Sequence, residues 1–364
     1  MTDILGIGSS GLTAYRKLLE TTGNNIANAN TDGYIRRDVV LKSVGEAQML
    51  PTARVASSGS GVTVDLIRRA SDAFLQMQVR AASARQAQSQ IVSDGLIRLE
   101  KAVIAPANTI GTAVQDFYAK AQDLSVSPAA TTSRLALIDS GQRIAESFRA
   151  AATAVTNEIN SADTSLKSSI EAVNSLASQI ATLNLDISRS GKGQQKLNDL
   201  LDQRDVLLNS LSKLVNFTVV EKDSGSVDLY LGDAASGPKL VDLGTSRMLG
   251  SMKDGEKTEL IFDPYGNANV TNQVTGGAIA GLIELQKSAR RFLENLDQLA
   301  VGFTAAINTQ HRQGLDLNGR QGADMFSAEG LQAVAVPSNR GSAKVNVTVD
   351  GATQINSSAY TATY

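Results

Sequence analysis

The chain has 364 residues, 42% of them hydrophobic and 19% charged, and its formal net charge is -2. This length predicts roughly two to three domains, the hydrophobic content excludes a disordered chain, and the scattered charges exclude a basic face for nucleic acid. The lack of cysteine excludes a disulfide framework, a thiolate metal site and a thiol nucleophile.

The N-terminal sequence MTDILGIGSSGL differs from a secretory signal, because it has an early aspartate and neither a basic segment nor a long apolar run. The chain also lacks an uncharged stretch of about 18 apolar residues that could span a membrane. We therefore expect a soluble chain without membrane contact, which would leave the cell, if exported, without a cleaved signal peptide.

Six mostly apolar residues near the N-terminus recur at alternating spacings of three and four, a pattern typical of a helix that pairs with another helix. These residues are Leu12, Tyr15, Leu19, Thr22, Ile26 and Ala29. A helix of roughly 20 residues with Gly23 at its centre is marginal in water by itself. Its partner is either a segment of the same folded monomer, or another segment or copy that joins it during assembly.

The segment NNIANANTDGY, residues 24–34, is expected to end this helix. Asn28, Asn30 and Gly33 tolerate the left-handed conformation that stops helices, and amide side chains can satisfy the backbone groups left open there. An extended segment from Tyr34 to Leu41 and a loop over 42–62 are predicted to follow.

Long helices are predicted for most of the next 150 residues, over 66–104, 108–124, 134–189 and 197–214. The first carries a weak apolar stripe through Phe74, Met77, Ala81, Ala84 and Ile91. The third carries a heptad seam, with Ile159, Leu166, Val173, Ile180 and Ile187 seven residues apart. The short break at Ser190–Gly193 predicts that the last two helices form an antiparallel hairpin.

Residues 216–262 change to alternating patterns around glycine-containing turns, which predicts a small β insert. A helical seam then resumes over 282–307, and KVNVTVD at 344–350 predicts a strand, with another possible strand at 360–364. Because aromatic residues are only 4% of the chain, narrow helix packing is expected. The predicted fold class is mainly α, an elongated antiparallel long-helix bundle with a small β insert and the start of a β-rich outer domain.

Several local patterns resemble catalytic or ligand motifs but lack the context that these motifs need. GIGSSG at 6–11 has no preceding strand, and Ser210 to Lys213 spells S-x-x-K without a Lys-Thr-Gly element. His311 is the only histidine, and the calcium-like 316–319 segment lacks a closing glutamate. We expect no enzyme activity, cofactor or metal.

Three arginine pairs are predicted to be solvated rather than functional. They are Arg36–Arg37, Arg68–Arg69 and Arg290–Arg291. Scattered basic pairs of this kind more often lie on a hydrated surface than in a binding site.

Three segments together resemble a known family. SSGLTAYRKLLETTGNNIANANTDGYIRR, at 9–37, is similar to the N-terminal signature shared by bacterial flagellar axial proteins of the rod, hook and hook-filament junction. The stretches at 197–220 and 275–326 resemble the family of flagellar hook-associated protein 1, or FlgK, the first of the hook-filament junction proteins.

This resemblance implies a structural protein of the extracellular flagellum, exported through the flagellar type III apparatus. Its copies would form a ring that adapts the hook to the filament, with the hook protein and the second junction protein as neighbours. In the family, the N-terminal helix and a C-terminal helix form a coiled coil in the inner tube, and the other domains lie further out.

The implied domains are an axial helix with its motif at 1–41, the first part of a helical rod at 42–215, a β insert at 216–274, a returning rod helix at 275–311, and a linker with the start of an outer domain at 312–364. Family members continue to a C-terminal helix that binds an export chaperone. Because this sequence stops without such a helix, it is expected to be a fragment.

By resemblance, residues 24–34 join the inner-tube helix to the rest of the subunit, and their amides are expected to find partners in the assembly. The candidate assembly residues are Leu12, Tyr15, Leu19, Asn24, Asn25, Ile26, Asn28, Asn30, Thr31, Gly33 and Tyr34. Two alternatives stay open, another axial protein of the hook or rod, and a self-contained surface adhesin or binding module on a helical stalk.

Overall fold

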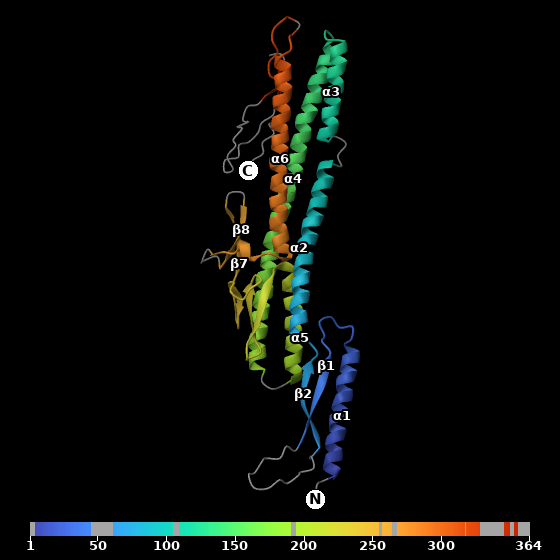
Figure 1. Ribbon diagram of the computed structural model, residues 1–364, viewed down its shortest axis with the longest axis vertical. Coiled ribbons are helices and arrows are strands. Elements are labelled where there is room, and N and C mark those ends of the chain that lie inside the picture. Colours follow the sequence, from blue (N-terminus) through green and yellow to red (C-terminus); the bar gives the residue numbers. More distant parts are fainter. Residues whose placement is uncertain are drawn as a thin grey trace. The chain divides into compact units, whose positions relative to one another are not determined.

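A computed structural model of the chain describes residues 4–44, 61–104, 109–190, 194–254, 257–263, 268–316, 318–327, 346–349 and 353–355. Within these residues the chain forms six α-helices (Figure 1). They are α1 (Ile4–Ala27), α2 (Ala73–Ile104), α3 (Ile110–Val126), α4 (Thr131–Arg189), α5 (Gln194–Leu214) and α6 (Gly277–Arg312). The prediction of a mainly α fold built from long helices is confirmed.

Strands form four small antiparallel sheets within the described residues. The strands are β1 (Arg37–Ser43) with β2 (Val62–Arg69); β3 (Phe217–Glu221), β4 (Val227–Leu231), β5 (Lys239–Asp242) and β6 (Thr245–Ser246) in that order; β7 (Leu249–Asp254), β8 (Lys257–Phe262) and β9 (Ala268–Asn269); and β10 (Phe326–Ser327), β11 (Asn346–Val349) and β12 (Thr353–Ile355). The β insert is therefore present, as β3 to β9.

The chain divides into two compact units. The first contains Met1–Ala87, Ser169–Ser251 and Glu259–Ile279, and the second contains Gln88–Ser168, Met252–Thr258 and Ala280–Tyr364. The helices α2, α4 and α6 each contribute residues to both units.

The core of the first unit contains the C-terminal part of the predicted heptad seam. Val173 and Ile180 of α4 are fully buried, as are Leu208 of α5 and Leu229 and Val241 of the β insert. Polar contacts fix the insert on α4, because the Asn184 amide donates to the carbonyl of Val227 at 2.8 Å and accepts from its N–H at 3.1 Å. Asn174 bonds to the N–H and carbonyl of Leu249 in the same way, at 2.8 and 2.9 Å.

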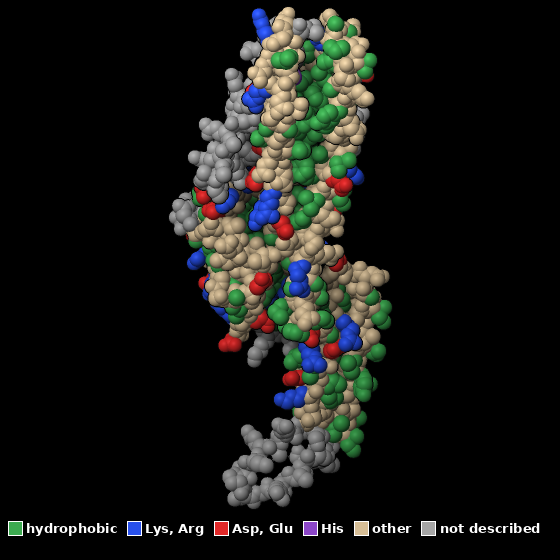
Figure 2. All heavy atoms as spheres, turned by 45° about the horizontal axis from the view of Figure 1, so that its top comes forward, with side chains coloured by type: hydrophobic (Ala, Val, Ile, Leu, Met, Phe, Trp, Pro, Cys, Tyr) green, Lys and Arg blue, Asp and Glu red, His purple; other side chains and the backbone are tan. Residues whose placement is uncertain are grey.

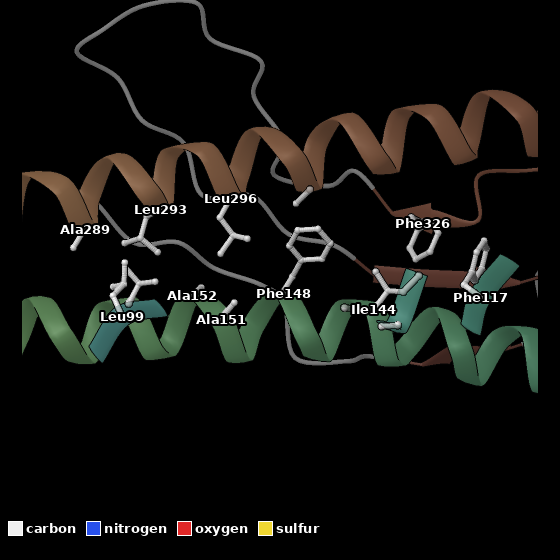
Figure 3. Close-up of a cluster of buried hydrophobic side chains, with 14 of the residues drawn as sticks. Leu99, Phe117, Ile144, Phe148, Ala151, Ala152, Ala289, Leu293, Leu296 and Phe326 are labelled. Atoms are coloured by element: carbon white, nitrogen blue, oxygen red, sulfur yellow. The ribbon is translucent and has the colours of Figure 1, made fainter. Parts of the chain in front are cut away.

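The core of the second unit is a cluster in which α4 and α6 face one another across small and large apolar side chains (Figure 3). Phe117, Phe303 and Phe326 meet at its end, with ring centroids 5.5 to 6.3 Å apart. The Asn308 amide of α6 bonds to both the N–H and the carbonyl of Phe326, at 2.8 and 2.6 Å. Aromatic packing and this amide therefore hold β10 on the helices.

The helix predicted from residue 66 starts later, because 62–69 form β2. This strand pairs with β1 from Arg37 opposite Arg69 to Ser43 opposite Val62. The helix begins where Asp72 accepts the N–H groups of Phe74 and Leu75 at 2.9 and 3.1 Å, as an N-cap residue does. Pairing with a distant segment thus overrides the local helical composition.

The strand predicted over 344–350 is present as β11. The strand predicted over 360–364 and most of the predicted outer domain lie outside the described residues. The predicted domain boundaries stay predictions.

We expect Leu296→Ala in α6 to lower the free energy of unfolding by about 2–5 kcal/mol, because it leaves a cavity in a packed core. Leu296 is 4% exposed, whereas Leu299 on the same helix is 55% exposed. Leu299→Ala should therefore cost less than about 1 kcal/mol. Native-state hydrogen exchange of the α6 amides measures both, and equal losses would contradict the packing described.

Candidate assembly interface

The first helix turns its apolar residues away from the protein. Leu12, Tyr15, Leu19 and Ile26 are 67 to 75% exposed, whereas Ala14 and Thr21 are buried. Hydrophobic side chains accordingly appear along α1 in Figure 2. We call the exposed face formed by Leu12, Tyr15, Leu19 and Ile26 the α1 seam. This orientation is the reverse of that of an ordinary surface helix, which buries its apolar stripe.

Small and polar side chains attach α1 to the β1–β2 hairpin. Toward the start of the helix, Ser10 Oγ accepts a hydrogen bond from the N–H of Val62 at 3.2 Å. The backbone approaches closely at Gly61, whose φ is +109° and where a Cβ atom would collide with Ser10 Oγ. Small and polar residues therefore provide much of the contact, together with the half-buried Leu18, whereas the residues of the α1 seam remain exposed.

Asn25 fixes the other end of α1 to β1. Its Nδ2 donates to the carbonyl of Arg37 at 2.9 Å, and its Oδ1 accepts the N–H of Arg37, also at 2.9 Å. The Tyr34 hydroxyl donates to the same Oδ1 at 2.9 Å. The side-chain amide thus acts as a strand partner for one residue of β1.

Asn25 and Asn28 have partners within the chain, as expected for amides that satisfy backbone groups at a helix end, whereas the expected contacts of this segment in an assembly stay a prediction. Asn28 Nδ2 donates to the carbonyl of Asn24 at 3.0 Å, and Asn28 Oδ1 accepts from the Thr31 hydroxyl at 3.2 Å. These bonds satisfy helix-end and turn groups, as local amides commonly do. Asn24 and Asn30 are exposed.

Gly33 provides the turn that leads from α1 into β1. Its φ is +79°, and a Cβ atom there would collide with Cγ2 of Val206 in α5. The position therefore requires glycine both for its left-handed backbone and for its close approach to α5.

A ladder of ion pairs joins the hairpin and the start of α2 to α5. One face of α5 presents polar groups three or four residues apart, from Asp199, Asp202, Asp205 and Asn209. Each arginine of the ladder bridges two of them: Arg37 bonds Asp199 and Asp202 (3.3 Å), Arg69 bonds Asp202 (2.7 Å) and Asp205, and Arg80 bonds Asp205 (2.8 Å) and Asn209 (3.0 Å). The three arginine side chains are 8 to 12% exposed.

The prediction that these arginine pairs are solvated is therefore wrong for Arg37 and Arg69, although Arg36 is 70% exposed. The signal that could have revealed the ladder is the D-x-x-D-x-x-D spacing at 199–205. It places three carboxylates on one helix face, and carboxylates there need cations when they are covered.

Burial and ion pairing act oppositely on the arginines. Burial would lower the pKa of Arg37, but its bonds to Asp199 and Asp202 outweigh this effect and raise the pKa. For Arg80, burial outweighs Asp205 and lowers the pKa. The Tyr34 ring lies 5.1 Å from the Arg37 guanidinium and adds a cation–π contact.

The catalytic and ligand patterns of the sequence form no reaction centre in the part of the chain that the structure describes. Gly6, Gly8 and Gly11 lie within α1, and the Ser210 hydroxyl donates to the carbonyl of Val206. The Asp316 carboxylate accepts the N–H groups of Arg320 and Asn318, and these bonds lower its pKa.

Across the described residues, the acidic and histidine side chains form no cluster that could hold a metal ion. The described helices also include none that is both long and apolar enough to cross a membrane.

A groove of about 890 Å³ lies beside the start of α2, between this helix, α5 and β3. Its walls include Phe74 and Met77, which are 64% and 54% exposed, and Phe217 and Val219 of β3. The apolar stripe predicted on this helix is therefore only partly covered by the residues that the structure describes.

Comparisons with known proteins place most of the chain in one family. Residues 96–326 match the model of the flagellar hook-associated protein FlgK helical domain, and residues 5–34 match that of the flagella basal body rod protein. The solved structure of the flagellar hook junction protein FlgK from Burkholderia pseudomallei superposes with a TM-score of 0.62 at 24% identity. The match covers 70% of this chain and 47% of that one, and shows that the fold is shared.

Curated relatives agree with this family. Flagellar hook-associated protein 1 of Escherichia coli strain K12 is 28% identical over 370 residues, covering 99% of this chain and 66% of that protein. The protein of the same name from Salmonella typhimurium is 30% identical over 359 residues, covering 96% and 63%. For Bacillus subtilis the identity is 28% over 364 residues, covering 92% and 72%. The chain thus spans about two thirds of the length of these relatives.

We expect Asn25→Ala to accelerate amide exchange at Arg37, because the substitution removes the acceptor for that N–H. Losing a buried hydrogen-bond partner costs about 1–3 kcal/mol. Asn30→Ala is the matched control, since Asn30 is an exposed asparagine of the same segment. Site-resolved exchange by NMR compares the two variants, and identical rates at Arg37 would contradict the role of the Asn25 amide.

Proposed function

The chain belongs to the family of flagellar hook-associated protein FlgK, and on that premise we propose that it is a structural protein of the hook-filament junction. In this proposal, copies of the protein assemble into a ring that adapts the hook to the filament and supports filament assembly. The role is mechanical and requires neither catalysis nor a cofactor.

The exposed α1 seam is the observation that carries this proposal. Leu12, Leu19 and Ile26 lie on one helix face at heptad spacing and are more than 70% exposed. Each would gain about 1.5–3 kcal/mol on full burial, and their spacing suits a facing helix. A partner helix outside the described fold therefore supplies the missing contact.

The remaining candidate residues divide into two roles in this proposal. Asn25, Gly33 and Tyr34 fix the turn between α1 and β1 through contacts within the chain. Asn24 and Asn30 are exposed beside the seam, where their amides are available to a neighbouring subunit. Asn28 and Thr31 bond to one another and shape the turn between these exposed amides.

The proposed neighbours are other copies of the chain, the hook protein and the second hook-filament junction protein. The proposed route is the flagellar type III apparatus without a cleaved signal peptide, which gives an extracellular location on the flagellum. A further proposed partner is the export chaperone, which in this family binds the C-terminal region.

A self-contained adhesin or binding module is less well supported than the junction role. Such a module needs its first helix packed within the monomer, whereas the four residues of the α1 seam are exposed. A hook or rod protein shares the N-terminal signature, but the match over 96–326 is to the FlgK helical domain.

Replacing Leu12, Leu19 and Ile26 with alanine should leave the melting temperature of the monomer nearly unchanged, because these side chains bury little surface in it. In the full-length protein, the same change should abolish incorporation at the hook tip, scored by labelling hooks in cells and by motility. A clear fall in melting temperature would contradict the exposed seam, and normal incorporation would contradict its assembly role.

The matched control replaces Met248, Met252 and Leu299 with alanine. These residues are 45 to 58% exposed and lie outside α1. The control removes three exposed apolar side chains while the α1 seam stays intact, so incorporation is expected to continue. Loss of incorporation in the control as well would mean that exposed apolar surface in general, rather than the seam, is what assembly requires.

A further inference from the structure

Arg37 bonds to two helices through different parts of one residue. Its backbone N–H and carbonyl are both held by the Asn25 amide of α1. Its guanidinium is held by Asp199 and Asp202 of α5. One residue of β1 thus bonds directly to both α1 and α5.

We propose that Arg37 is a positioning residue that couples α1 to α5. Mechanical load applied to the α1 seam then passes through the Asn25 amide and the Arg37 side chain into α5. The coupling itself is a property of the free chain. Its use under mechanical load rests on the proposed function.

The guanidinium is well placed to transmit such coupling. Its side chain is 8% exposed, so solvent does little to screen its bonds to the carboxylates. The Tyr34 ring lies 5.1 Å from the guanidinium, and the Tyr34 hydroxyl bonds to Asn25. The same tyrosine therefore contacts both Asn25 and the Arg37 guanidinium. A displacement of α1 would change the surroundings of the guanidinium charge.

The contact is also directional. The Nη2 group of Arg37 donates to both Asp199 and Asp202, and the planar guanidinium holds its donors in a fixed geometry, whereas a lysine ammonium sits on a flexible stem. The Asn25 amide likewise matches one N–H and one carbonyl, so neither bond survives a shift of α1 along β1. A displacement of α1 must therefore move Arg37 or break its bonds.

The first test is a double-mutant cycle between Asn25→Ala and Asp202→Asn, two residues that both bond to Arg37. The readout is the amide-exchange rate of β1 and α5 in the purified chain. We expect the two effects to be non-additive by a factor of about five or more. Additive effects would overturn the proposal.

Because Asp202 also bonds Arg69, the cycle is repeated in an Arg37→Ala background, which leaves the Arg69 bond in place. The non-additivity should disappear there if Arg37 carries the coupling, and its persistence would overturn the proposal. Arg37→Lys serves if the alanine variant fails to fold, since it keeps the charge but replaces the planar guanidinium with a flexible ammonium and should weaken the coupling. Unchanged coupling in that variant would equally overturn the proposal.

Arg36→Ala is the matched control, because Arg36 is the adjacent arginine and its side chain is 70% exposed. It should leave the cycle unchanged, and a loss of coupling in this control would overturn the assignment to Arg37.

A test in cells separates this inference from the proposed function. Full-length protein with Arg37→Ala should enter the junction, because the α1 seam is intact, but its filaments should detach at lower shear than those of wild type or Arg36→Ala. Wild-type resistance to shear would overturn the load-bearing role. If the α1 seam variant assembles normally, that result would count against the proposed function. It would leave the coupling measured in the free chain unaffected.

Discussion

The fold depends on how helices hold strand backbones that lack a full set of strand partners. A helix surface offers no backbone ladder, yet buried N–H and carbonyl groups must be paired. Asparagine solves this problem repeatedly, because its side-chain amide matches one N–H and one carbonyl. The pairs are Asn25 with Arg37, Asn174 with Leu249, Asn184 with Val227, and Asn308 with Phe326. Each fixes one strand residue at one position on a helix.

This mode of attachment explains how α1 can remain fixed while its apolar face stays exposed. A helix that docked through leucines would bury the surface it needs for another helix. Attachment through Ser10, Ala14, Thr21 and Asn25 uses small or hydrogen-bonding residues instead. The exposed seam and the polar attachment are thus two consequences of one arrangement.

Regular periodicity made the helices and the apolar seam of α1 predictable, although it left open whether a segment of the same monomer covers that seam. The heptad residues from Leu166 to Ile187 are buried as expected, and the alternation around 217–231 forms the β3–β4 hairpin. The β2 strand was missed because its pairing with β1 is a long-range property, which local composition does not reveal. The partners of Asn25 and Arg37 were missed for a related reason, since both depend on segments brought together only by the fold. The assembly role of the seam stays a prediction, because the described residues show only that the seam is exposed.

The arginine ladder adds a constraint that apolar packing could not provide. An apolar contact between the hairpin and α5 would tolerate small shifts along the helix, because apolar faces discriminate poorly between registers. In the ladder, each arginine bridges two acceptors of a row with fixed spacing. A shift of one position would leave a charged group covered and unpaired, at a cost of several kcal/mol. The ladder therefore sets where the hairpin lies on α5, and through Asn25 it sets where α1 presents its seam. For a helix whose partner belongs to another segment or molecule, that position has to be defined before the partner arrives.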